Sequence, residues 1–466
     1  MLKRINYIFS VLFVMITGSC NKLTDVGNPV NSTTNGNVFQ NDATATAVVT
    51  GMYAKAMLPT ISFLNGGVTI FPALSADEFV SNGINSTVLE FMNNSLLSSN
   101  QTIRTTLWIN AYSLLYQANA AIEGISASKT ITDAAKKQLL GESYFMRAFI
   151  FFNLVNLYGD IPLIITTNYQ TNAVLGRANE ALVKSRINQD LTTAISLLNA
   201  DYPTSNRVRV NKWAALSLLS RMNLYEEKWT AAEMEASQVI NAGIYSLEQD
   251  LNNVFLYNSK ESILQFMPVS TGYNTTEGHQ LIPGPGSTST PICSLSPWLI
   301  SAFEPQDKRY SNWVNNKTVA GTVYTYPYKY KQRANFTTGF ILSEYYMVLR
   351  LAEQYLIRAE ARAHMQQLPG AIADLDSIRN RAGLPLISVT NPAITRDELL
   401  VAIQKERQTE LFAEWGHRWF DLKRTKQADV VLKDRKPSWN STDTLYPIPA
   451  SERILNPNLT QNDGYN

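Results

Sequence analysis

Three glutamates near the C-terminus, Glu406, Glu410 and Glu414, are the most obvious candidates for acid–base chemistry in this sequence. A pair of carboxylates can hydrolyse a glycosidic bond, but the two groups must face each other across a cleft. Residues that are four positions apart instead share one face of a helix. Basic residues, including Lys405 and Arg407, are interleaved with these acids. We therefore interpret the cluster as a structural ion-pair network and not as a catalytic pair.

The histidine and cysteine content gives no support for a metal site or a disulfide framework. The three histidines, His279, His364 and His417, are far apart in the sequence, and the two cysteines are Cys20 and Cys293. Metal sites built from these residue types need several of them at close spacing. The sequence also lacks a G-x-S-x-G elbow, a P-loop, a dinucleotide-binding fingerprint and an EF-hand loop. It predicts a protein that is not an enzyme, with no metal, no cofactor and a buried, inert Cys293.

Aromatic side chains among short polar residues indicate a different function, the binding of sugars. The C–H face of a pyranose stacks on a flat aromatic ring, while amide and hydroxyl groups bind the sugar hydroxyls. The candidates for ligand contact are Trp298, Trp313, Tyr273, Tyr324 and Tyr326. Each of them could instead pack a small core beneath the loops. Trp108 and the pair Asp77–Glu78 are further candidates that could reach the same site.

The composition places these candidates in a globular, mainly helical chain. The 466 residues are 45% hydrophobic and 17% charged, with 40 basic against 38 acidic side chains. The net charge of +2 gives no strong field for nucleic acid, so we expect no nucleic-acid partner. Apolar residues recur at helical spacing over 134–158. Two helix pairs carry apolar and small residues where tetratricopeptide repeats pack, and they are 212–225 with 230–241 and 346–364 with 370–381.

The region between these helix pairs differs in composition and predicts loops. It is rich in Gly, Pro, Ser, Thr, Asn and Tyr, and loops on a rigid scaffold are where binding residues concentrate. A short strand is expected over 262–267. The sequence thus predicts one domain over 42–466. Its parts are a helical scaffold (about 42–245 and 345–425), a loop-rich, ligand-facing region with a few short strands (about 246–344) and a C-terminal extended segment (426–466).

Four tyrosines alternate strictly within the loop-rich region. A strand would place Tyr324, Tyr326, Tyr328 and Tyr330 on one face. Pro327 lies inside this run and cannot donate a hydrogen bond to a neighbouring strand. The run is therefore expected to be an edge strand or an extended loop.

The N-terminus resembles the signal of a bacterial lipoprotein. Two basic residues precede an apolar run over 5–16 that is too short to span a bilayer stably. Small residues then lead directly to Cys20. This pattern predicts a signal peptide over 1–19, a lipid on Cys20, and a flexible tether over 20–41 that is rich in Asn, Thr, Gly and Ser. No later segment has 18 uninterrupted apolar residues, so we predict no transmembrane helix.

Three stretches of the mature chain carry long motifs. The first runs from Gly141 to Pro162 and ends in Tyr-Gly-Asp-Ile-Pro. The second runs from Glu406 to Arg424 and contains Glu-Trp-Gly-His-Arg-Trp-Phe-Asp-Leu. The third begins with Tyr-Pro-Ile-Pro at Tyr446. In order and spacing these motifs resemble the SusD/RagB family, the surface nutrient-binding lipoproteins of Bacteroidota.

This resemblance implies tetratricopeptide-like helix pairs that support a variable, loop-rich face. It also implies a lipid-anchored protein on the surface of the outer membrane that captures oligosaccharide without catalysis. The implied partner is a SusC-like, TonB-dependent transporter, which receives the oligosaccharide. Three alternatives remain open: a peptide-capturing member of the same family, a surface glycosidase, and a structural lid that contacts no ligand.

Overall fold

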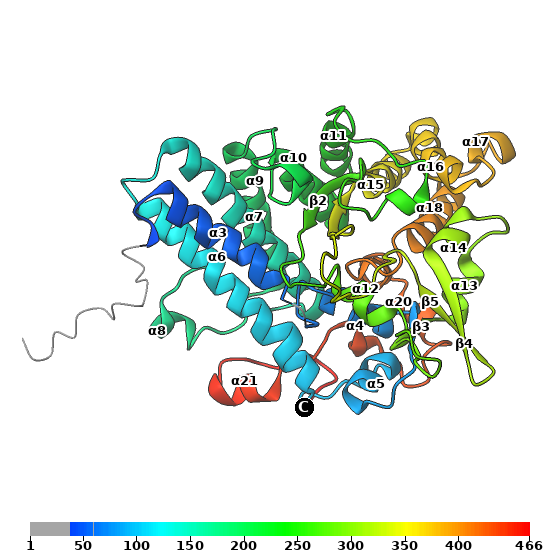
Figure 1. The fold of residues 1–466 in the computed structure, drawn as a ribbon, viewed down its shortest axis with the longest axis horizontal. Coiled ribbons are helices and arrows are strands. Elements are labelled where there is room, and N and C mark those ends of the chain that lie inside the picture. The colour runs from blue at the N-terminus through cyan, green and yellow to red at the C-terminus, as the bar shows by residue number, and fades with distance from the viewer. Residues whose placement is uncertain (1–37, 59) are drawn as a thin grey trace, which may run out of the picture.

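Helices form most of the molecule in the computed structural model, which describes residues 38–58 and 60–466 (Figure 1). The predicted signal peptide, the predicted lipid site Cys20 and most of the predicted tether lie outside the described residues. Long helices run along the left and the top of the molecule in Figure 1. In chain order they are α3 (Asp42–Ala56), α6 (Asn110–Ala127), α7 (Asp133–Tyr158), α9 (Glu180–Leu197), α10 (Lys212–Tyr225), α11 (Trp229–Ile240), α15 (Leu351–His364), α16 (Leu368–Ala382) and α18 (Arg396–Glu410).

Consecutive helices of this scaffold pack against each other, which confirms the predicted helix pairs. α6 lies against α7, α7 against α9, α10 against α11, and α15 against α16. The predicted helix over 346–364 is wrong at its start, because α15 begins only at Leu351. Tyr346–Arg350 forms strand β6 instead, since every residue in it is buried and it pairs with strand β2 (Ser262–Phe266). Strand β2 itself confirms the strand expected over 262–267.

Polar caps and one glycine set the ends of two scaffold helices. Thr132 accepts a hydrogen bond from the Ala135 N–H at the start of α7, at 3.4 Å. Gly159 ends α7 with a φ of 70°, a left-handed conformation that favours glycine. At the start of α18, Thr395 and Glu398 form a capping box. These boundaries follow from local sequence and position the motifs that come after them.

Strands in the described residues form three two-stranded antiparallel sheets. β5 is an edge strand that ends at Pro327, as the proline predicts. Of the four alternating tyrosines, only Tyr324 and Tyr326 lie in it, and Tyr330 packs in the core against Phe255. The chain leaves the strand at the proline, so the shared face for all four tyrosines does not form. The three sheets are β1 (Phe79–Ser81) with β3 (Cys293–Leu295), β2 with β6, and β4 (Val314–Val319) with β5 (Thr322–Pro327).

Short helices connect the scaffold to the loops and to the C-terminal segment. A π-helical segment, Thr102–Ile109, leads into α6. The others are α4 (Gly67–Ser75), α5 (Ser86–Asn93), α8 (Tyr169–Asn172), α12 (Thr276–Leu281), α13 (Pro297–Ala302), α14 (Lys308–Trp313), α17 (Ile387–Thr390), α19 (His417–Arg424), α20 (Ala428–Leu432) and α21 (Ala450–Leu455).

The C-terminal segment docks onto the end of α7, which brings the first and third sequence motifs together. The Tyr446 N–H donates to the carbonyl of Leu157 at 2.8 Å. The side-chain amide of Asn462 donates to the carbonyls of Tyr158 and Tyr446, each at 2.8 Å. α7 is apolar and buried around most of its circumference, as a helix at the centre of a core must be. In the part of the chain that the structure describes, no helix has the length and apolar character needed to cross a membrane.

Candidate functional site

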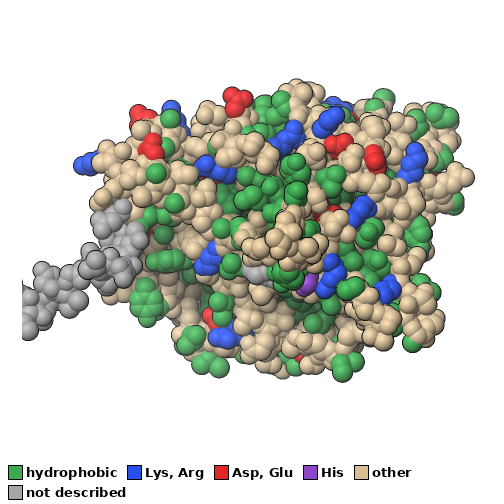
Figure 2. Space-filling view, in the orientation of Figure 1, with side chains coloured by type: hydrophobic (Ala, Val, Ile, Leu, Met, Phe, Trp, Pro, Cys, Tyr) green, Lys and Arg blue, Asp and Glu red, His purple; other side chains and the backbone are tan. Residues whose placement is uncertain are grey.

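Three segments that are distant in the sequence lie together and form a surface that we call the loop face: residues 79–82, 292–298 and 314–328. β1 pairs with β3, and β3 packs beside β5. Figure 1 places β3, β4 and β5 at the lower right, away from the long scaffold helices at the left and top. In the same part of Figure 2, uncharged polar and apolar side chains predominate and acidic side chains are few. A surface of this kind suits a neutral polar ligand.

An amide and a hydroxyl group meet at the edge of the β1–β3 sheet. Asn82 directly follows β1, and its Nδ2 donates to Ser294 Oγ at 2.8 Å and to the Pro291 carbonyl at 3.0 Å. Both side chains are half-buried, so part of each remains accessible. Sequence reasoning missed this pair because its members are 212 residues apart and neither belongs to a local motif.

The β4–β5 hairpin places Tyr324 on the loop face. Tyr324 is half-buried and lies opposite Lys317 in the register of the two strands. The Lys317 Nζ donates to the carbonyls of Gly284 and Gly286, at 2.7 and 2.8 Å. The lysine thereby connects the segment around Gly284 and Gly286 to the hairpin, and its ammonium group is occupied by backbone carbonyls.

Trp298 lies at the start of α13, directly after β3. Ser296 caps this helix by accepting the Leu299 N–H at 3.1 Å, and Pro297 is its first residue. The indole is half-buried, and the guanidinium carbon of Arg435 lies 5.7 Å from the ring centroid. A guanidinium at this distance makes a cation–π contact. Trp298 therefore has a partly open aromatic surface with a hydrogen-bond donor beside it.

A buried carboxylate holds that guanidinium in place. Asp77 is fully buried and pairs with Arg435, while Arg418 donates to it through Nε at 2.7 Å and Nη2 at 2.9 Å. Burial alone would raise the pKa of Asp77, but Arg418 and Arg435 outweigh burial and lower it. Burial raises the pKa of the neighbouring Glu78 to about 8. Asp77 and Glu78 thus lie beneath the loop face, where Asp77 positions Arg435 next to Trp298.

The structure corrects two of the aromatic candidates. Trp313 is fully buried, and its Nε1 donates to the carbonyl of Leu251 at 2.9 Å. The Lys329 ammonium lies 4.7 Å from its ring centroid, so the indole belongs to the core. Tyr326 is only 6% exposed and packs edge-on against Tyr328. Neither ring offers a face to a ligand, because both pack inward beneath the hairpin.

The remaining candidates lie in different places. Tyr273 is half-buried on a separate loop, where its ring contacts His279 at 5.1 Å and Phe336 at 5.4 Å between centroids. Trp108 is buried in the scaffold, edge-on to Tyr158. Of the predicted residues, the structure therefore brings Trp298 and Tyr324 to the loop face. It adds Asn82, Ser294 and Arg435, which sequence reasoning did not identify.

The glutamates of the second motif are engaged in buried ion pairs, which confirms the structural interpretation. Glu410 pairs with Arg350 at 2.5 Å, Glu414 with the same arginine at 2.8 Å, and Glu406 with Arg309 at 2.6 Å. The spacing predicts one helix for all three glutamates, but this is wrong for Glu414, because α18 ends at Glu410. Burial would raise the pKa of Glu414, but the adjacent cations lower it. Carboxylates held in this way have no free position for acid–base chemistry.

Cys293 is buried in β3, as predicted, and burial raises the pKa of its thiol to about 12. Within residues 38–58 and 60–466, no group of three or more His, Cys, Asp or Glu side chains could hold a metal ion.

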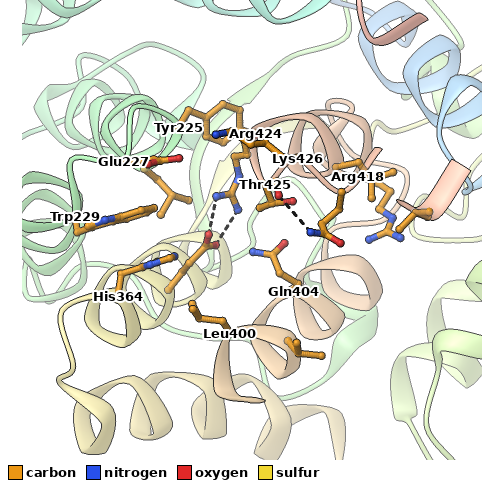
Figure 3. A pocket seen from close by; sticks show the side chains of 16 residues that line it. Tyr225, Glu227, Trp229, His364, Leu400, Gln404, Arg418, Arg424, Thr425 and Lys426 are labelled. Atoms are coloured by element: carbon orange, nitrogen blue, oxygen red, sulfur yellow. Dashed lines mark hydrogen bonds and ion pairs between the residues drawn. The ribbon is translucent and has the colours of Figure 1, made fainter. Parts of the chain in front are cut away.

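A cavity of about 580 Å³ lies outside the loop face, among the scaffold helices and α18–α20 (Figure 3). Trp229 and His364 form one wall, with parallel rings whose centroids are 3.8 Å apart. The sequence predicts Trp229 as a packing residue of a helix pair, and its spacing gives no signal for a cavity. The side chains labelled in Figure 3 are Tyr225, Glu227, Trp229, His364, Leu400, Gln404, Arg418, Arg424, Thr425 and Lys426.

Comparison with known families gives two matches on separate parts of the chain. Residues 298–465 match the model described as the SusD family. Residues 29–224 match a related model described as "starch-binding associating with outer membrane". The two matches together include all three sequence motifs.

Individual proteins support the same relationship at low identity. A SusD-like protein of Formosa agariphila is 27% identical, with 100% of both chains covered. The structure of a SusD superfamily protein from Bacteroides vulgatus has a TM-score of 0.80 at 21% identity, covering 92% of this chain and 100% of its own. A laminarin-binding SusD-like protein has a TM-score of 0.76 at 24% identity, with the same coverage. These structural similarities confirm the mainly helical fold.

Proposed function

This chain belongs to the SusD/RagB family, and we propose that it is a surface lipoprotein that captures oligosaccharide for import. In this proposal Cys20 carries the lipid that anchors the protein to the outer membrane. The segment 20–41 is the tether. The captured oligosaccharide passes to a SusC-like, TonB-dependent transporter. Anchoring near the transporter raises the effective concentration of ligand, so modest affinity is sufficient.

The observation that carries the proposal is the chemistry of the loop face around Trp298. A partly open indole, the Asn82 amide and the Ser294 hydroxyl provide stacking and neutral hydrogen bonding, which sugars require. Tyr324 adds a second half-buried ring. Two solved structures with the same fold are named for glycans, the laminarin-binding protein and a surface glycan-binding protein from Bacteroides thetaiotaomicron.

A non-catalytic role fits the distribution of acidic groups. Residues 79–82, 292–298 and 314–328 contain no Asp or Glu. A glycosidase needs two carboxylates across the bound sugar, roughly 5–10 Å apart. The adjacent carboxylates of Asp77 and Glu78 are both buried, and Asp77 is paired with two guanidinium groups. The loop face therefore supplies binding groups without an acid–base pair.

The proposal is tested by calorimetry on the soluble chain that starts after Cys20. The ligands are a panel of gluco-, xylo- and mannohexaoses and a panel of unstructured peptides, and mass spectrometry checks each mixture for cleavage. We expect saturable binding of a saccharide without cleavage. Trp298→Ala should weaken binding at least tenfold, because the stacking surface is lost. Trp213→Ala is the matched control, since Trp213 is also half-buried but lies on α10 outside the loop face.

Each other outcome rejects a specific part of the proposal. Binding of peptides alone indicates the peptide-capturing alternative, and cleavage of a saccharide indicates a glycosidase. Saccharide binding that Trp298→Ala leaves intact places the site elsewhere. Binding of neither panel supports the structural lid.

A further inference from the structure

The cavity beside Trp229 has the size and shape of a small-molecule site. Its volume of about 580 Å³ lies within the range of roughly 300–1,000 Å³ that is typical of ligand pockets. Figure 3 shows side chains from α10, α11, α15, α18 and α19 converging on it. None of its lining residues belongs to the loop face.

The charged groups at the base of the cavity neutralise one another. Arg424 donates to both oxygens of Glu360, at 2.6 and 2.8 Å, and its Nε donates to Asp421 at 2.7 Å. Arg407 completes the group by donating to Asp421 at 2.8 Å. Two guanidinium groups therefore face two carboxylates. An ionic ligand would find no unpaired counter-charge here.

The other charged residues around the cavity do not change this balance. Glu227 and Lys426 are exposed and carry opposite charges. Arg418 directs two of its nitrogens to Asp77, outside the cavity. Charge thus gives little selectivity, and recognition must come from neutral groups.

Those neutral groups are an aromatic wall and the Gln404 amide. Trp229 stacks on His364 and is still only half-buried, so part of the indole is open to the cavity. The Gln404 side chain lines the same space (Figure 3).

We propose that this cavity is a second saccharide-binding site, which takes a neutral sugar residue against Trp229 with hydrogen bonds to Gln404. The inference rests on the proposed glycan-binding function for the class of ligand, but not for the location of the site. Two sites on one tethered protein hold a long glycan more tightly than either site alone.

The first variant is Gln404→Ala, because it removes an amide that lines the cavity. Gln404 is half-buried on α18, so its loss should change stability little. Affinity at the cavity should fall about three- to tenfold. Gln408→Ala is the matched control, since Gln408 is also half-buried on α18 but does not line this cavity.

A second variant removes the stacking surface. Trp229→Ala should lower affinity at the cavity at least tenfold. Trp213→Ala serves again as the control for loss of a half-buried indole. Circular dichroism verifies that both variants retain the helical fold.

The experiment titrates the neutral hexaose panel and an oligogalacturonate into the Trp298→Ala protein, which lacks the loop-face platform. We expect residual binding of a neutral hexaose that Gln404→Ala and Trp229→Ala weaken and the two controls do not. If wild-type protein binds but Trp298→Ala abolishes all binding, the second site is overturned while the proposed function stands. If only oligogalacturonate binds, the neutral class is overturned. If wild-type protein binds no saccharide, both proposals are overturned.

Discussion

Replacing Asp77 with asparagine perturbs the ion pairs that support the loop face. Asp77 is fully buried, accepts two hydrogen bonds from Arg418 at 2.7 and 2.9 Å, and also pairs with Arg435. Removing one partner of a buried ion pair costs roughly 3–5 kcal/mol. The Arg435 side chain is 29% exposed, so solvent screens that part of the interaction, and an asparagine oxygen can still accept a hydrogen bond. We therefore expect Asp77→Asn to lower the free energy of unfolding by about 2–3 kcal/mol at neutral pH.

The assay is equilibrium unfolding in urea, followed by tryptophan fluorescence. Asp434→Asn is the control, because Asp434 is exposed and its loss should change stability by less than about 0.5 kcal/mol. The folded state lowers the pKa of Asp77, so its stabilising effect is present above the unfolded pKa of about 4 and is lost as the pH falls through the folded pKa. The difference between wild type and Asp77→Asn should therefore shrink below about pH 4. A loss of stability under about 0.5 kcal/mol in Asp77→Asn at neutral pH would contradict this role of Asp77. A difference between wild type and Asp77→Asn that stays the same in acid would contradict it as well.

Three further predictions follow from the buried charges and the loop face. Glu410→Gln should lower the free energy of unfolding by roughly 3–5 kcal/mol in the same urea assay, because it leaves buried guanidinium groups unpaired. The exposed Glu398→Gln is the control, and an equal loss of stability in the two variants contradicts the prediction. Burial raises the pKa of Glu277 to about 7, so Glu277 should account for on the order of 1–3 kcal/mol of the stability that wild type loses as the pH rises from about 5 to 8. Glu277→Gln should lose that much less over the same pH range, and equal pH dependence in both proteins rejects the assignment. Arg435→Gln should weaken saccharide binding about two- to fivefold in calorimetry, because the guanidinium beside Trp298 is lost. Arg453→Gln is the control, and an unchanged affinity of Arg435→Gln would show that Arg435 is not part of the site.

The helical scaffold could be predicted because its signals are local. Apolar periodicity predicts α7, and Gly159 marks its end. One boundary that failed, at Tyr346–Arg350, falls in an apolar run that continues directly into α15. A short run buried on both faces looks the same in sequence whether it is a strand or part of a helix. Only pairing with β2 decides between them.

The candidate site was predictable in kind but not in place. Trp298 and Trp313 both lie in polar, loop-rich sequence, yet one is partly open and the other is in the core. The difference depends on which side of each segment packs against distant elements, such as the carbonyl of Leu251. The contact between Asn82 and Ser294 likewise depends on the pairing of β1 with β3. Local composition contains none of this information.

A structure of the mature protein with the oligosaccharide that binds best in the calorimetric panel is the strongest test of glycan binding at the loop face. We expect a sugar ring stacked on Trp298, within hydrogen-bonding distance of Asn82 or Ser294, with its glycosidic bonds intact. A bound oligosaccharide with no contact to residues 79–82, 292–298 or 314–328 would contradict it.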